Sequence, residues 1–252
     1  MKQIKMVNRY RTLEISVPER YSEMNGKQLL AAVRFSLEEI DAVDFYKAMG
    51  IPRSWQRKLK LFCLFEIQHI LGFLNALEEP CDHFIIPNIM RGKMVAPGKR
   101  LAGMSLQQFM TVDSYFSYYS CTENEEFLVN MMAAIYLKQK EDFVIDERHP
   151  VLLNIEKRVL YLKDKTDKAL LRATYLNWIL IKNWLSKEFK FLFPKSVSEE
   201  RQKPQPVDWL KIFDAFVGEN IPQSEYYQAM ECMNAFRILN EKIRQQQEAN
   251  KI

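Results

Sequence analysis

The chain has 252 residues, of which 48% are hydrophobic, and this content excludes a chain that is disordered throughout. Seven Gly are few for this length, which argues against a barrel or sandwich with many tight turns and against a glycine-rich phosphate loop. The formal net charge of +4 does not by itself indicate a nucleic-acid partner.

The N-terminal third predicts one short strand followed by helices. Apolar and polar residues alternate over Thr12–Val17, and a proline follows, so this stretch is expected to be a strand. A helix is expected over Glu23–Phe35. The sequence Ser-Leu-Glu-Glu at the start of Ser36–Met49 has the pattern of a capping box and predicts a second helix. A third helix, long and apolar, is expected over Ser54–Leu77.

The middle of the chain predicts a loop and then more helices. Residues 80–104 carry Pro, Gly and short β-rich pieces, so we expect an irregular hairpin that interrupts the helical body. Capping patterns at Ser105–Gln108 and Thr122–Glu125 predict two helices, which reach about Tyr119 and Lys138 and are joined by a short turn. A helix over residues 151–163 follows.

Residues 166–194 predict the helix around which the chain is organised. On a helical wheel, the polar side chains form one stripe roughly 140° wide, and apolar side chains cover most of the remainder. A helix that is apolar over more than half its circumference must be packed on several sides. We therefore expect one continuous core helix that other helices enclose.

The C-terminal part predicts a linker and a small helical segment. Residues 195–206 are polar and contain two Pro, which is typical of a linker. Beyond it, Pro206 and Gly218 bracket one helix, and Pro222 precedes a final helix. The fold class predicted is mainly α: a multi-helix bundle over residues 1–194 with a short N-terminal strand and the irregular loop, then the linker, then a segment over 207–252.

The cysteines and histidines do not predict a catalytic or metal site. The four Cys are widely spaced with no CxxC pair, which indicates reduced thiols in a reducing compartment. Cys63, His69, Cys81 and His83 are the one Cys–His cluster, but their spacing matches no usual zinc pattern. Cys63 and His69 would lie roughly 240° apart on a helix. No nucleophile motif is present, so we expect no enzyme, no metal and no cofactor.

Two groups of basic residues are candidates for contacts with a partner. Arg53, Arg57 and Lys60 recur along one helix face, which is typical of a solvated face and, in the alternative reading, of contacts to phosphates. The central loop is the better candidate, because it is expected to be exposed and carries both basic and apolar side chains, which could contact either a protein or a nucleic-acid backbone. The partner-binding residues predicted are Arg91, Lys93, Met94, Lys99 and Arg100 of this loop, together with Trp209 of the C-terminal segment.

The order of several landmarks resembles a known group of proteins. A strand ending in Ile-Ser-Val-Pro comes first, and Leu-Ala-Gly-Met-Ser-Leu-Gln-Gln-Phe precedes an aromatic helix at residues 101–109. The core helix closes with Phe-Leu-Phe-Pro at residues 191–194, and Trp209 heads the C-terminal segment. In this order the chain is similar to uncharacterised proteins encoded among the tail and virion-assembly genes of phages and prophages of gut bacteria. The resemblance implies a virion component, or a helper that holds tail proteins before assembly, and no catalytic residues.

These observations predict a non-enzymatic phage or prophage tail-assembly or virion structural protein. Its partners would be other virion or tail proteins, or a second copy of itself. The alternative is a cytoplasmic nucleic-acid-binding or regulatory helical protein. No stretch is long and apolar enough for a signal peptide or a membrane span, so we expect the protein in the host cytoplasm during assembly, or in the virion. Removing residues 91–100 is expected to leave the fold intact and to abolish partner binding.

Overall fold

A computed structural model describes residues 1–7, 12–56, 71–75, 77–138, 155–194, 208–218 and 223–249. Most of these residues are helical, and the strands form one two-stranded and one three-stranded sheet, so the predicted mainly α fold is confirmed. Most of the long helix predicted from Ser54, and the linker predicted at 195–206, lie outside the described residues.

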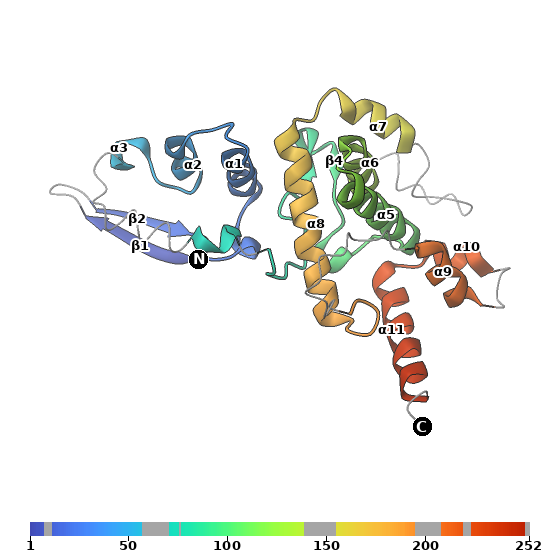
Figure 1. The fold of residues 1–252 in the computed structure, drawn as a ribbon. Helices are drawn as coiled ribbons and strands as arrows, with labels where there is room; N and C mark the ends of the chain where they lie inside the picture. Colours follow the sequence, from blue (N-terminus) through green and yellow to red (C-terminus); the bar gives the residue numbers. More distant parts are fainter. Residues whose placement is uncertain are drawn as a thin grey trace.

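The N-terminal part of the chain forms a hairpin and short helices (Figure 1). Strand β1 (Lys2–Val7) pairs antiparallel with β2 (Thr12–Val17), so the predicted strand is confirmed, and it has a partner strand that was not predicted. Ile15 and Val17 of β2 are buried in the core. The helices that follow are η1 (Tyr21–Glu23), α1 (Gly26–Ser36), α2 (Ala42–Ala48), α3 (Arg53–Gln56) and η2 (Leu71–Asn75).

The capping box predicted at Ser36 is wrong. Ser36 is the last residue of α1, and its hydroxyl donates to the Val33 carbonyl. Glu38 then adopts a left-handed backbone with φ of 59°, so no helix can begin there. Helix α2 begins instead after Asp41, whose carboxylate accepts from the Asp44 amide.

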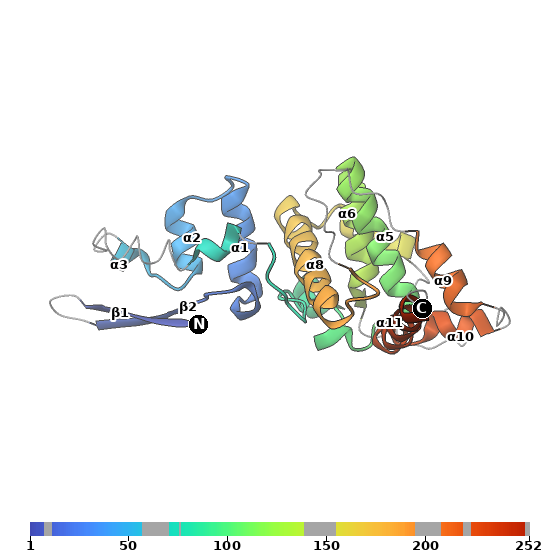
Figure 2. The same ribbon diagram turned by 60° about the horizontal axis from the view of Figure 1, so that its bottom comes forward.

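Helix α8 (Lys168–Glu188) is continuous, and the core helix predicted over 166–194 is confirmed up to Glu188. Asp167 caps its start, and many of its apolar side chains are buried, including the fully buried Trp178. Figures 1 and 2 both place α8 between the N-terminal helices and a pair formed by α5 (Leu106–Thr122) and α6 (Glu125–Ile135). Helix α7 (Ile155–Lys163) packs against α6.

The capping residues predicted for α5 and α6 differ in outcome. Ser105 caps α5 as expected, because its hydroxyl accepts from the Gln108 amide. Helix α6 is capped by Asn124 rather than by Thr122. Thr122 is still the last residue of α5, because that helix ends at Glu123 with a left-handed backbone. Thr122 is therefore not in position to cap the next helix.

The C-terminal helices contribute side chains to the core of the molecule. They are α9 (Trp209–Val217), α10 (Ser224–Ala229) and α11 (Cys232–Ala249). Phe109 of α5 stacks edge-on against Trp209 and Phe236, with ring centroids 5.3 and 4.7 Å apart. The single final helix that was predicted is split into α10 and α11, because the Met230 carbonyl accepts from the Leu106 amide at 2.8 Å.

No helix within the described ranges has the length and apolar character needed to cross a membrane.

Candidate functional site

The central loop forms the irregular hairpin that the sequence predicts. Strand β3 (Asn88–Ile89) pairs antiparallel with β4 (Met94–Val95), which pairs antiparallel with β5 (Leu137–Lys138). Between β3 and β4, the short turn η3 (Met90–Gly92) forms the tip of the hairpin. A second turn, η4 (Lys99–Leu101), leads back to α5.

The loop is held in the core, so two expectations about it need correction. Met94 is only 1% exposed and cannot present its side chain to a partner. Ile89, Leu101 and Met104 are buried in the same cluster, and β4 is the middle strand of its sheet. Removing residues 91–100 would therefore take away core side chains and β4, and would not leave the fold intact.

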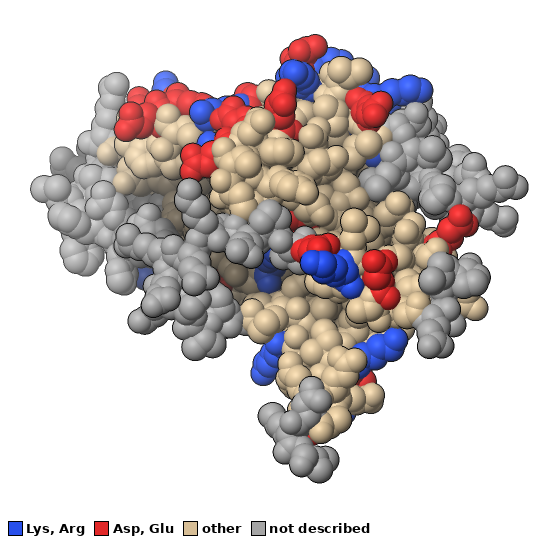
Figure 3. Space-filling view, turned by 45° about the vertical axis from the view of Figure 1, so that its right-hand side comes forward, with Lys and Arg blue, Asp and Glu red and all other residues tan. Residues whose placement is uncertain are grey.

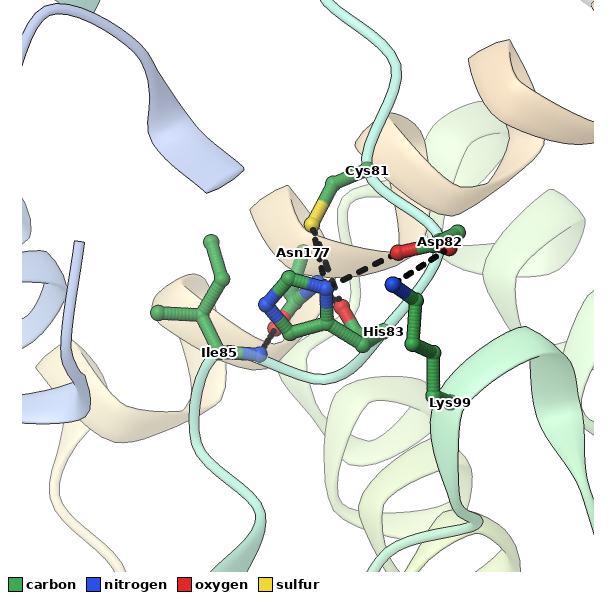
Figure 4. A network of polar contacts seen from close by, with 6 residues as sticks. All are labelled: Cys81, Asp82, His83, Ile85, Lys99 and Asn177. Atoms are coloured by element: carbon green, nitrogen blue, oxygen red, sulfur yellow. Dashed lines mark hydrogen bonds and ion pairs between the residues drawn. The ribbon is translucent and has the colours of Figure 1, made fainter. Parts of the chain in front are cut away.

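A turn at Cys81–Asp82–His83 fastens the loop to α8 (Figure 4). The Cys81 amide donates to the Leu180 carbonyl at 3.0 Å. Asn177 of α8 connects the two sides of the turn, because its amide nitrogen donates to the His83 carbonyl and its oxygen accepts from the Ile85 amide. Asp82 accepts from the Arg100 amide through its carbonyl and contacts Lys99 Nζ at 3.4 Å through its carboxylate.

The same turn lacks the geometry of a nucleophilic site. Cys81 Sγ lies 3.6 Å and Asp82 Oδ1 lies 3.0 Å from the same imidazole nitrogen, Nδ1 of His83. A catalytic dyad oriented by a carboxylate needs the two groups on opposite nitrogens. The Cys81 side chain is also buried. Among the described residues, no three His, Cys, Asp or Glu side chains are grouped so that they could hold a metal ion. These groups support the loop.

The turn makes stability depend on pH. The hydrogen bond with Cys81, together with the one to Asp82, raises the pKa of His83 from 6.5 to about 9, although partial burial acts in the opposite direction. Burial acts to raise the pKa of Asp82, but the hydrogen bonds from His83 and Lys99 outweigh it and lower that pKa. A raised histidine pKa contributes stability that is fully present below pH 6.5 and is lost as the pH rises through about 9.

We therefore expect the urea midpoint of the protein to fall between pH 6.5 and 9.5, and to fall less in His83→Gln. The glutamine amide can still donate to Asp82 but does not titrate. Parallel urea titrations at several pH values measure the difference between the two proteins. An identical fall in both proteins would contradict the assigned role of His83.

The predicted partner-binding cations divide into paired and unpaired groups. Arg100 binds Glu188 at 3.1 Å and lies over the Trp184 ring, and Lys99 binds Asp82, so both hold the loop to the body. Arg91 and Lys93 at the hairpin tip are exposed, and neither has a partner within the part of the chain that the structure describes. The hairpin tip, defined as residues 90–93, is the surface that remains for a partner.

The phosphate contacts considered for the alternative function are less prominent. Arg53 binds Asp44 at 2.8 Å, and Arg57 and Lys60 lie outside the described residues. On the face shown in Figure 3, acidic and basic side chains are interspersed along the upper edge. Around the start of α8, Glu125 contacts both Lys168 and Arg172. This edge therefore has no extended field of one sign, which phosphate binding would need.

The hairpin tip contains strained backbone. Met90 and Arg91 both adopt left-handed conformations, with φ of 52° and 59°, which cost a non-glycine residue about 1–2 kcal/mol each. Arg91→Gly is expected to raise the free energy of unfolding by about 1 kcal/mol, because glycine tolerates this conformation. Urea denaturation measures the change. Lys93→Gly is the control: Lys93 has φ of −73°, so the substitution should give no stabilisation. A destabilised Arg91→Gly variant would contradict the assigned strain.

A second polar cluster lies in the core, and no pattern in the sequence predicted it. Asp113 of α5 is fully buried. Its Oδ1 accepts from Trp178 Nε1 at 3.1 Å and lies 2.8 Å from Lys182 Nζ, and its Oδ2 accepts from Trp209 Nε1 at 2.9 Å. Trp209 is only 5% exposed, so the prediction that it contacts a partner needs correction. Its indole connects α9 to α5.

A cavity of about 560 Å³ lies beside this cluster. Its lining combines polar groups of α8 with apolar side chains that include Phe193, Trp209 and Ile212. The volume would suit a small ligand. However, the Asp113 side chain is fully buried, and its carboxylate already binds three donors of this chain, the indoles of Trp178 and Trp209 and the ammonium of Lys182. The cluster therefore joins α5, α8 and α9.

Comparison of the sequence with models of protein families and with curated proteins found no match, and comparison of the structure with solved structures found none.

Proposed function

We propose that this chain is a non-enzymatic tail-assembly or virion structural protein of a phage or prophage, and that it acts through protein–protein contacts at the hairpin tip. The observation that carries the proposal is the pair Arg91 and Lys93. Both are exposed, and neither has an acidic partner among the described residues. The order of sequence landmarks at residues 101–109 and 191–194 supports the phage context.

The contacts that hold the base of the hairpin favour recognition of the partner by a preformed surface. Contacts of Asp82 with Lys99 and with the Arg100 backbone, and of Arg100 with Glu188, hold both sides of the loop. A tip on such a base loses little conformational freedom on binding, which favours affinity for a partner. Within the Asp113 cluster, and separately within the turn at His83, the polar groups bind partners of this chain. This supports a structural role for both groups rather than a catalytic one.

The two exposed cations of the tip, and the mixed charge along the edge seen in Figure 3, favour a protein partner over a nucleic acid. A nucleic-acid site of ordinary affinity neutralises several phosphates with a continuous set of basic side chains. An acidic protein surface can be recognised by one or two well-placed cations, because charge complementarity fixes the orientation of the partner. In this proposal the partner is another virion or tail protein, met in the host cytoplasm during assembly.

Affinity purification of the tagged full chain from cells that produce the phage particles tests this proposal. We expect virion or tail proteins to co-purify, and to remain after nuclease treatment of the lysate. Recovery of nucleic acid with no virion protein, or loss of all partners after nuclease treatment, would contradict it. Mass spectrometry of purified particles then shows whether the chain stays in the virion.

A further inference from the structure

A groove of about 640 Å³ runs between the start of α1 and strand β3. Its lining is mainly apolar and includes Leu30 and Met90, together with Leu170 of α8. Gly26 lies close to Ile85 and Ile86, because a Cβ at that position would be 3.4 Å from atoms of both residues. The start of α1 therefore packs against the segment that leads into β3, and the groove lies beside this contact.

One wall of the groove is the open edge of a sheet. The sheet has the order β3–β4–β5, so β3 is an edge strand. The Ala96 amide donates to the Pro87 carbonyl at 2.9 Å, and hydrogen-bonded and non-hydrogen-bonded pairs alternate along an antiparallel ladder. In this register the pair Asn88–Val95 is the non-hydrogen-bonded one. The N–H and C=O of Asn88 thus point away from β4, and no other described residue binds them.

The charge of the groove is of one sign. Lys27 and Arg91 are the charged residues in its described lining, and no acidic side chain is among them. Lys93 adds a third cation at the adjoining hairpin tip. An occupant that complements the groove therefore carries carboxylates.

We infer that this groove binds an extended segment of the partner in which acidic and apolar residues alternate, and that the segment adds as a strand to the edge of β3. This inference rests on the proposed function, since it names the kind of partner segment that the hairpin tip recognises. Main-chain hydrogen bonds to Asn88 supply the pairing. Because side chains alternate along a strand, apolar residues of the segment face Leu30 and Leu170 while acidic residues reach Lys27 and Arg91.

The short strand sets a limit on affinity and explains the need for the other contacts. One residue of β3 offers only two main-chain hydrogen bonds, and each contributes little net binding free energy because it replaces hydrogen bonds to water. Apolar burial in the groove and the charged contacts must supply the remainder. A peptide with glutamates but no apolar residues, or with apolar residues but no acids, is expected to bind poorly.

The probe is a fluorescein-labelled eight-residue peptide in which glutamate alternates with valine, measured by anisotropy with the full chain. We expect binding, with at least tenfold weaker affinity for Leu30→Ser and for Arg91→Glu. Replacing the glutamates by lysine is expected to abolish binding. Methylation of the backbone nitrogens of the central valines should weaken it at least tenfold, because these N–H groups pair with the strand edge. Circular dichroism confirms that each variant is folded.

The outcomes separate this inference from the proposed function. If virion proteins co-purify through Arg91 but the peptide does not bind, the groove inference is wrong and the proposed function stands. If the peptide binds but no virion protein co-purifies, the groove inference stands and the functional assignment fails. If binding survives backbone methylation, strand addition is wrong. If binding survives Leu30→Ser, occupation of the groove is wrong.

Discussion

Asp113→Ala is expected to lower the free energy of unfolding by about 3–5 kcal/mol, the usual cost of removing one partner of a buried ion pair. The substitution leaves the Lys182 ammonium without its carboxylate in a mostly buried position. It also leaves the indole N–H groups of Trp178 and Trp209 without their acceptor. Each buried donor that is left without an acceptor adds its own desolvation cost, so the expected loss of stability is large for a single substitution.

A double-mutant cycle distinguishes this explanation from a simple loss of packing. Lys182→Met should also destabilise the protein, because it leaves a buried carboxylate without its cation. The double variant Asp113→Ala/Lys182→Met should lose less than the sum of the two single losses, since neither charge remains. Asp214→Ala, at an exposed position of α9, is the matched control and should change stability by less than about 0.5 kcal/mol.

Urea denaturation followed by tryptophan fluorescence is the measurement, because two of the indoles bind Asp113 directly. A loss below about 1 kcal/mol in Asp113→Ala, or strict additivity in the cycle, would contradict the role of this cluster as the connection among α5, α8 and α9.

Charge reversal at the hairpin tip, Arg91→Glu/Lys93→Glu, is expected to weaken partner binding about 100-fold without loss of stability. Each reversal replaces an attractive contact with a repulsive one, and together they cost about 2.7 kcal/mol of binding free energy at this fold-change. Both side chains are exposed, so the core is not disturbed. Binding of the co-purified partner to the purified variant measures the effect.

The matched control for this variant is Lys157→Glu/Lys190→Glu. It changes the net charge by the same amount at two exposed lysines on α7 and beyond the end of α8. We expect this control to bind the partner as the wild-type chain does. Equal weakening in both double variants would mean that net charge, and not the hairpin tip, determines binding.

The core helix could be predicted from the sequence because its signal is local. A helix that is apolar over most of its circumference has to be enclosed, and α8 is enclosed as expected. The cap at Ser105 is local in the same way. The cap at Ser36 failed although the pattern was similar, because α1 continues through Ser36 and the next helix begins only after Asp41, five residues later. Two adjacent capping patterns in the sequence do not show which of them the backbone uses.

The contacts that decide the site are not local. Asp113 meets Trp178 and Trp209, which lie 65 and 96 residues away in sequence, so no spacing rule brings them together. A single aspartate in an aromatic helix, such as Asp113, does not by itself predict a buried carboxylate. The composition of the loop around Met94 is typical of an exposed loop. Met94 is nevertheless buried, because its strand β4 pairs with a strand on each side. The sequence could identify the basic loop but not which cations remain unpaired.

Hydrogen–deuterium exchange of the full chain, with and without its co-purified partner, tests the central claim most directly. If the hairpin tip and the β3 edge are the partner-binding surface, protection should appear over residues 86–93 and around the start of α1, with the rest of the body unchanged. Protection confined to another surface, such as α9 or the region around Arg53, with unchanged exchange at residues 86–93, would contradict it.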